Sequence, residues 1–107
     1  MPTIDVPAAV LEVVLQTLNR HVPDREIRVM GSRAQGQGER FSDLDLVVMG
    51  SEPLELRTLG QLRDAFDDSN LPFVVDIIEW ASCADGFRRL IETHAKPFRS
   101  PTVVSSR

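Results

Sequence analysis

Residues 31–50 read GSRAQGQGERFSDLDLVVMG, and this stretch decides the fold of the chain. It begins with a Gly-Ser pair, continues through a polar segment with two more glycines, and ends in an apolar run at residues 46–49 followed by Gly50. A short apolar run bounded by turn residues is typical of a buried strand, which we expect at residues 43–49. Two carboxylates, those of Asp43 and Asp45, therefore lie where this strand begins.

The two aspartates are expected to face the same side of the strand, because residues two apart in a strand share a face at a spacing of about 6.6 Å. Neighbouring carboxylates repel each other and resist burial. Open solvent relieves this repulsion, so exposed residues at a strand end are the simpler interpretation. A divalent metal ion relieves it better, and Mg²⁺ in proteins commonly binds one or two carboxylates together with substrate phosphates.

The Gly-Ser pair follows a strand predicted at residues 26–30 and precedes a short helix predicted at residues 32–35. Backbone N–H groups at such a turn, together with the helix dipole, form a site for a phosphate. Gly31 would allow a close backbone approach that a side chain would block. Arg33 and Arg40, on either side of a glycine-containing loop, are candidates for binding phosphate oxygens, with solvated surface arginines as the alternative.

A third carboxylate interrupts an apolar run at residues 73–78, which we expect to be a buried strand near the first. Burying the charge of Asp76 is costly unless it is paired or metal-bound, and a salt bridge to an arginine such as Arg28 is the alternative to a metal. A phosphate site, a metal-binding pair and a third carboxylate together indicate nucleotidyl transfer. In such a reaction two metal ions stabilise the attacking and leaving oxygens, and a carboxylate can accept the nucleophile's proton.

The remaining segments are predicted to be mainly helical. Apolar residues at steps of three and four predict helices at residues 5–20 and 54–66. Ser82 and Asp85 resemble a capping box that opens a last helix, which ends near His94. We expect the last ten residues to be loosely held.

Helices thus alternate with strands along a chain of 107 residues, a length that fits one domain, residues 1–107. The expected fold class is α/β (α+β), with a small mixed β-sheet and helices packed against it.

Composition and charge restrict the classes of function that we expect for the chain. A net charge of −4 argues against direct nucleic-acid binding. The single cysteine, Cys83, fits a reducing compartment, and neither histidine has the spacing of a metal ligand. The start of the chain lacks the pattern of a secretion signal, and no apolar run reaches membrane-spanning length. We therefore expect a cytoplasmic protein that does not enter a membrane.

The spacing of the motif residues resembles a known family. Gly31-Ser32, ten intervening residues and then Asp43-Leu44-Asp45 resemble the Gly-Ser-x10-Asp-x-Asp signature of the DNA polymerase β-like nucleotidyltransferase superfamily. More closely, residues 31–50 followed by VVDIIEW at residues 74–80 resemble the minimal nucleotidyltransferases, which are single-domain proteins of about this length.

This resemblance implies a polymerase β-like nucleotidyltransferase fold, with ATP as the substrate and Mg²⁺ as the cofactor. The residues implied in nucleotide binding are Gly31, Ser32 and Arg33. The residues implied both in metal binding and in catalysis are Asp43, Asp45 and Asp76.

The resemblance also implies a partner. Many minimal nucleotidyltransferases act as antitoxins that transfer AMP to a HEPN-domain toxin. We therefore expect a HEPN-type protein as the acceptor, modified on a hydroxyl side chain. Two alternatives remain open: an antitoxin that acts by contact alone with a vestigial nucleotide site, and nucleotidyl transfer to a small molecule such as an aminoglycoside.

A basic segment near the end of the chain is a candidate docking surface. From residue 87 onward five basic residues stand against the single acid Glu92. An acidic partner could dock there, and a solvated helix face is the alternative.

Overall fold

The computed structural model describes residues 7–31 and 43–101. Its elements in chain order are α1 (Ala8–His21), β1 (Ile27–Met30), β2 (Leu44–Val48), α2 (Leu56–Asp68), β3 (Val75–Glu79), the short 3₁₀ helix η2 (Trp80–Ser82), α3 (Asp85–His94) and β4 (Lys96–Arg99). None of the helices in these two segments is both long and apolar enough to cross a membrane.

The four strands form one mixed sheet in the order β3-β2-β1-β4. Strand β1 runs antiparallel to both of its neighbours, whereas β2 and β3 are parallel. The register sets Met30 of β1 opposite Asp45 of β2, and Asp45 opposite Asp76 of β3. The predicted fold class, a small mixed sheet with packed helices, is confirmed.

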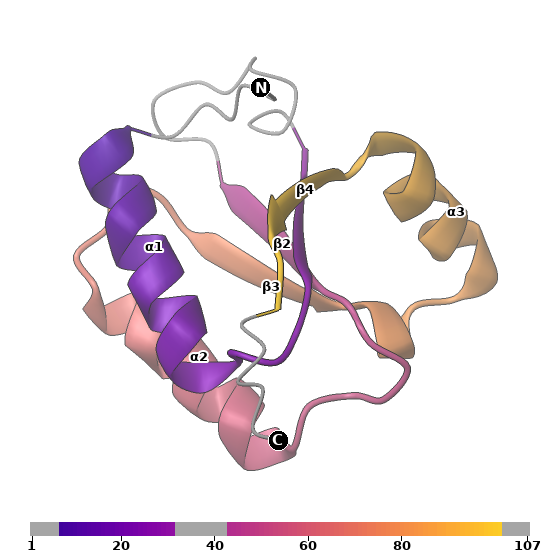
Figure 1. Cartoon of the computed structure of the whole chain (residues 1–107), viewed down its shortest axis with the longest axis horizontal. Coiled ribbons are helices and arrows are strands. Elements are labelled where there is room, and N and C mark those ends of the chain that lie inside the picture. Colours follow the sequence, from indigo (N-terminus) through magenta and orange to yellow (C-terminus); the bar gives the residue numbers. More distant parts are fainter. Residues whose placement is uncertain (1–6, 32–42, 102–107) are drawn as a thin grey trace.

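Helices α1 and α2 lie together on one face of the sheet (Figure 1). Their apolar stripes pack on alternate residues of the strands, as the predicted periodicities require. The buried members of this cluster are Val14, Leu18, Val22, Ile27, Val29, Leu44, Leu46, Val48, Leu59, Leu62, Phe66 and Ile77. This face holds most of the core.

Helix α3 lies on the other face of the sheet (Figure 1). There Ile91 packs with Val47 and Met49 in a second, smaller buried cluster. The half-buried side chains against this cluster are Met30, Ile78, Trp80, Cys83 and Ala95. This face is therefore only partly covered.

Several predicted boundaries moved by one or two residues, and one capping prediction was wrong. Ala84 is the N-cap of α3, and its side chain makes no capping hydrogen bond. Ser82 belongs to the preceding 3₁₀ helix η2. The backbone of residues 80–82 makes a separate turn after β3, so Ser82 lies too early to cap the helix. The helix predicted at residues 32–35 and the loop at residues 36–40 lie outside the described residues.

Strand β4 was not predicted, and it includes Phe98 and Arg99, which we expected to be loosely held. Phe98 packs against the larger core cluster. The guanidinium of Arg99 donates hydrogen bonds around the end of α1, to the side chain of Asn19 (3.0 Å) and to the carbonyl oxygens of Val22 (2.6 Å), Pro23 (3.4 Å) and Arg25 (2.7 Å). These contacts are long-range and carry no local sequence signal.

Strand β3 is less buried than its sequence indicated. Only Ile77 is fully buried, while Val74 is 57% exposed and Asp76 is exposed. The strand lies at an edge of the sheet. Its apolar side chains point to both faces of the sheet. The sequence therefore shows a continuous apolar run although the strand is not fully buried.

Candidate functional site

The candidate site begins where β1 ends. Gly31 has a φ of +84°, a conformation that side chains other than glycine's rarely adopt. A Cβ atom at this position would lie 2.8 Å from Oδ2 of Asp45. Glycine is therefore required for both the backbone conformation and the close contact with Asp45. Its predicted role in binding phosphate stays a prediction.

Asp45 and Asp76 lie next to each other on the partly covered face. They are register partners across β2 and β3. Alternation along each strand sets Asp45 on the same face as Val47, and Asp76 on the same face as Ile78, both of which pack in the α3 cluster. Asp43 is exposed and directly precedes β2. The strand that carries Asp76 was expected to lie near the strand of Asp43 and Asp45, and β3 does pair with β2.

The carboxylates carry unbalanced negative charge, as the pKa of Asp45 shows. Burial raises this pKa above the ordinary value of 3.8, and so do the charges of Asp76 and Asp43 and a side-chain hydrogen bond with Asp76. Each cause disfavours the ionised form of Asp45. A bound cation would reverse this balance.

Arg28, named as a possible salt-bridge partner of Asp76, pairs with another acid instead. The Nε atom of Arg28 lies 2.9 Å from Oε2 of Glu26, and the two form an ion pair. In the sheet Arg28 stands opposite Val47, which is two residues along β2 from Asp45.

The donors fit an oxygen-binding cation, but they do not form a closed metal cage. Asp43, Asp45 and Asp76 offer only carboxylate oxygens, the ligands that Mg²⁺ prefers. Among residues 7–31 and 43–101, no three His, Cys, Asp or Glu side chains are gathered closely enough to enclose an ion. Such open coordination suits a metal that shares its ligands with substrate phosphates.

Two of the predicted nucleotide-binding residues, Ser32 and Arg33, lie outside the described residues, as does Arg40. Another residue at the site was missed. Met30 is half-buried and stands opposite Asp45 in the register, so it borders the carboxylates on the β1 side. The sequence shows that a strand ends before Gly31, but it does not show which residue of that strand faces Asp45.

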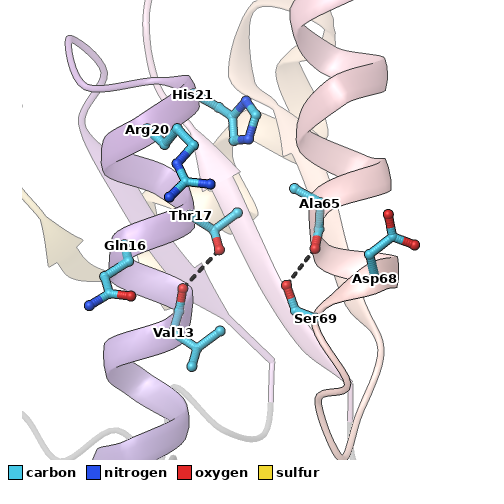
Figure 2. A pocket seen from close by; sticks show the side chains of 8 residues that line it. All are labelled: Val13, Gln16, Thr17, Arg20, His21, Ala65, Asp68 and Ser69. Atoms are coloured by element: carbon cyan, nitrogen blue, oxygen red, sulfur yellow. Dashed lines mark hydrogen bonds between the residues drawn. The ribbon is translucent and has the colours of Figure 1, made fainter.

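A hollow of about 310 Å³ between α1 and α2 is not part of this site. It lies on the α1 and α2 side of the sheet, away from the carboxylates. Figure 2 shows its hydroxyl groups turned back onto their own helices. Thr17 donates to the carbonyl oxygen of Val13 (2.8 Å), and Ser69 donates to that of Ala65. These groups are already satisfied within their helices.

A comparison with protein families agrees with this arrangement. Residues 11–99 match the family described as nucleotidyltransferase domain. The chain belongs to the nucleotidyltransferase-domain family. Within it the chain is a minimal nucleotidyltransferase, as its motif spacing predicted. Members of this family generally use a divalent metal ion with a nucleotide substrate.

One curated relative is similar over most of its length. The chain is 36% identical over 88 residues to a probable protein adenylyltransferase, MntA, of Haemophilus influenzae. The match spans 82% of this chain and 77% of the relative.

Solved structures share the fold at lower identity. A chain in a crystal structure of a toxin–antitoxin with AMP-PNP matches with a TM-score of 0.69 and 23% identity, over 84% of this chain and 73% of that chain. A complex of a tri-AMPylated HEPN toxin from Shewanella oneidensis with an MNT antitoxin matches with a TM-score of 0.63 and 19% identity, over 86% and 71%. At these identities the likeness shows the fold.

Proposed function

We propose that this nucleotidyltransferase is a cytoplasmic, Mg²⁺-dependent protein adenylyltransferase that acts as an antitoxin. It transfers AMP from ATP to a hydroxyl side chain of a HEPN-type toxin. The observation that carries this proposal is the close contact of Gly31 with Asp45, which itself stands opposite Asp76. The similarity to a probable protein adenylyltransferase and the shared fold with antitoxins solved with HEPN toxins support the choice of acceptor.

The chemistry is an in-line displacement at the α-phosphorus of ATP. The acceptor's hydroxyl oxygen forms a bond to this phosphorus, the bond to the bridging oxygen breaks, and pyrophosphate leaves. Mg²⁺ bound by Asp43, Asp45 and Asp76 would neutralise phosphate charge. Asp76 is exposed, so we assign it the hydroxyl proton of the incoming acceptor.

The turn at Gly31 and Ser32 would position the triphosphate beside the carboxylates. Gly31 leaves its backbone open to close approach, and Ser32 and Arg33 are the next donors along the chain. A phosphate at this turn would lie near Asp45, because a Cβ atom at position 31 would come within 2.8 Å of Oδ2 of that carboxylate. Substrate and carboxylates would then share one end of the sheet.

Intact mass spectrometry tests this function. The HEPN-domain protein of the same genome is incubated with this chain, ATP and Mg²⁺, and we expect mass increases in steps of one AMP. The increase should disappear with a chelator and with Asp45→Asn. If the Asp45→Asn protein neutralises the toxin as well as the wild type does, and the toxin gains no mass with either, the contact-only antitoxin is the correct reading. AMP transfer to an aminoglycoside but not to the protein would establish the small-molecule alternative.

A further inference from the structure

Asp45 lies in the middle of a row of side chains that crosses three strands. Met30 of β1 stands opposite it on one side, and Asp76 of β3 stands opposite it on the other. In an antiparallel pair such as β1 and β2, side chains of opposed residues share a face, with their Cβ atoms about 5 Å apart. The Asp45 carboxylate therefore has one apolar and one acidic neighbour across the sheet.

Met30 is held in place by its own packing. Its side chain is half-buried and packs against the small cluster on the α3 face. The buried members of that cluster are Val47, Met49 and Ile91. Ala95, which directly follows α3, packs against the same cluster. Met30 is thus a packed side chain beside Asp45, and its freedom to move away is restricted.

The turn after β1 limits the Asp45 carboxyl from a third side. A Cβ atom at position 31 would lie 2.8 Å from Oδ2 of Asp45, so Gly31 leaves only enough room for this oxygen. The carboxyl also forms a side-chain hydrogen bond with Asp76. The polar contact of Asp45 is therefore directed across the sheet to β3, and Met30 lies on the side away from it.

The chemistry of methionine fits this place. Its thioether has no hydrogen to donate, whereas glutamine and lysine, which have a similar length, do. A donor at position 30 would form a charge-assisted hydrogen bond with Asp45 and draw the carboxylate toward β1. Two carboxylates that face each other can share one divalent cation, provided that neither is turned away.

We propose that Met30 is a positioning residue for the metal site. As a neighbour that donates no hydrogen bond, it leaves the carboxylate of Asp45 directed at Asp76, where the two hold one divalent cation. Met30 acts through Asp45, because its own side chain offers no oxygen ligand. This inference rests on the proposed function, because that function assigns the metal ion to these carboxylates.

The decisive variants are Met30→Gln and Met30→Lys, which add a donor at nearly the length of methionine. Met30→Leu keeps the position apolar. Met49→Gln is the matched control, because it makes the same substitution in the same cluster, at a side chain that is 9% exposed and four positions from Asp45. Electron paramagnetic resonance measures the binding of Mn²⁺ alone to the nucleotide-free protein. Thermal unfolding with a chelator reports the effect of each change on stability.

We expect Met30→Gln to weaken Mn²⁺ binding about tenfold, because a hydrogen bond to a charged group competes with the cation. Met30→Lys should weaken it at least about a hundredfold, because an ammonium group beside Asp45 also neutralises its charge. Met30→Leu and Met49→Gln should stay within about twofold of wild type, although Met49→Gln lowers the melting temperature.

The transfer assay separates positioning from a general structural defect. In Met30→Gln the Mg²⁺ concentration that gives the half-maximal rate should rise about tenfold, as the weaker metal binding requires. The rate at saturating Mg²⁺ should stay within about threefold of wild type, because the carboxylates themselves are unchanged. A structural defect would instead lower the maximal rate and leave the Mg²⁺ dependence in place.

Three results would overturn the role of Met30. The first is wild-type Mn²⁺ affinity in both Met30→Gln and Met30→Lys. The second is an equal loss in Met30→Leu, which would mean that the shape of methionine matters and the missing donor does not. The third is an equal loss in Met49→Gln, which would assign the effect to the stability of the cluster.

Failure of the proposed function gives a different result. In that case the wild-type protein binds Mn²⁺, and the Met30 variants weaken this binding, but no AMP is transferred to the HEPN-domain protein. If the wild-type protein binds no Mn²⁺, the metal site itself is wrong and the role of Met30 is overturned with it.

Discussion

The two faces of the sheet differ in what they bury. The α1 and α2 face is filled by a large apolar cluster that draws side chains from both helices and three strands. The α3 face has a buried cluster of only three residues, and beside it stand Asp45 and Asp76. The first face holds most of the apolar core, and the second carries two neighbouring carboxylates. Strand β2 contributes to both faces, with Leu46 in the large cluster and Val47 in the small one.

The largest expected effect is a loss of AMP transfer when a carboxylate on the α3 face is changed. We predict that Asp45→Asn and Asp76→Asn each reduce AMP transfer to below about 0.1% of wild type, a loss of more than about 4 kcal/mol of transition-state stabilisation. Metal-free stability should hold or rise, because each change removes one of two repelling charges. Transfer assays together with urea unfolding in the presence of a chelator measure both quantities. A large loss of metal-free stability would indicate a structural role instead.

Cavity-forming substitutions on the two faces of the sheet should show how much each face contributes to the free energy of unfolding. We predict that Leu62→Ala, in the large cluster, costs about 4 kcal/mol of unfolding free energy, and that Ile91→Ala, in the small one, costs about 2 kcal/mol. Both side chains are completely buried. The smaller cost at Ile91 is expected because α3 can settle onto the sheet after the truncation. Equal costs, measured by urea unfolding, would mean that the two faces contribute alike.

Two glycines offer a sharper comparison. Gly31→Ala should lower stability by about 1–2 kcal/mol, because alanine is strained at positive φ. It should also reduce transfer, because the new Cβ displaces Oδ2 of Asp45. Gly60→Ala should raise stability by up to about 1 kcal/mol, since Gly60 lies within α2 with nothing within 4 Å of its Cβ position. Thermal unfolding and the transfer assay distinguish the two variants.

The smallest effect concerns pH. Because the pKa of Asp45 is raised in the folded protein, the folded state holds this proton at pH values where the unfolded chain has released it. The free energy of unfolding of the metal-free protein should therefore fall as pH rises from about 3.8 through the raised pKa. Asp45→Asn should remove this part of the pH dependence. Urea titrations at several pH values test it, and identical pH profiles for the two proteins would contradict the raised pKa.

Much of the site could be placed from the sequence because its signals are local. The turn at Gly31, the aspartates before an apolar run and the single acid within residues 73–78 are each visible within a few residues. These residues meet at one end of the sheet because β1 ends, and β2 and β3 begin, beside them. The ion pair of Arg28 with Glu26 is also local, since the two residues are only two positions apart, but it was not predicted.

The parts that could not be predicted depend on distant contacts. Strand β4 pairs with β1, and Arg99 reaches carbonyl oxygens around the end of α1, more than 70 positions earlier in the sequence. The exposure of Asp76 depends on β3 lying at the edge of the sheet, which its apolar composition conceals. The apolar stripe of α3 had the pattern of a buried helix face, and only packing shows that Ile91 alone is buried there.

The sequence by itself determined the order of helices α1 to α3 and strands β1 to β3, the family, and which three carboxylates are candidates for chemistry. Those features arise from periodicity, turn residues and spacing, all of which act over short distances. The tertiary structure alone decided that Asp45 and Asp76 face the less covered side, that β4 forms an edge of the sheet beside β1, and that Phe87 and Leu90 of α3 stay partly exposed. These depend on strand register and on which surfaces cover each other, and long-range packing sets both.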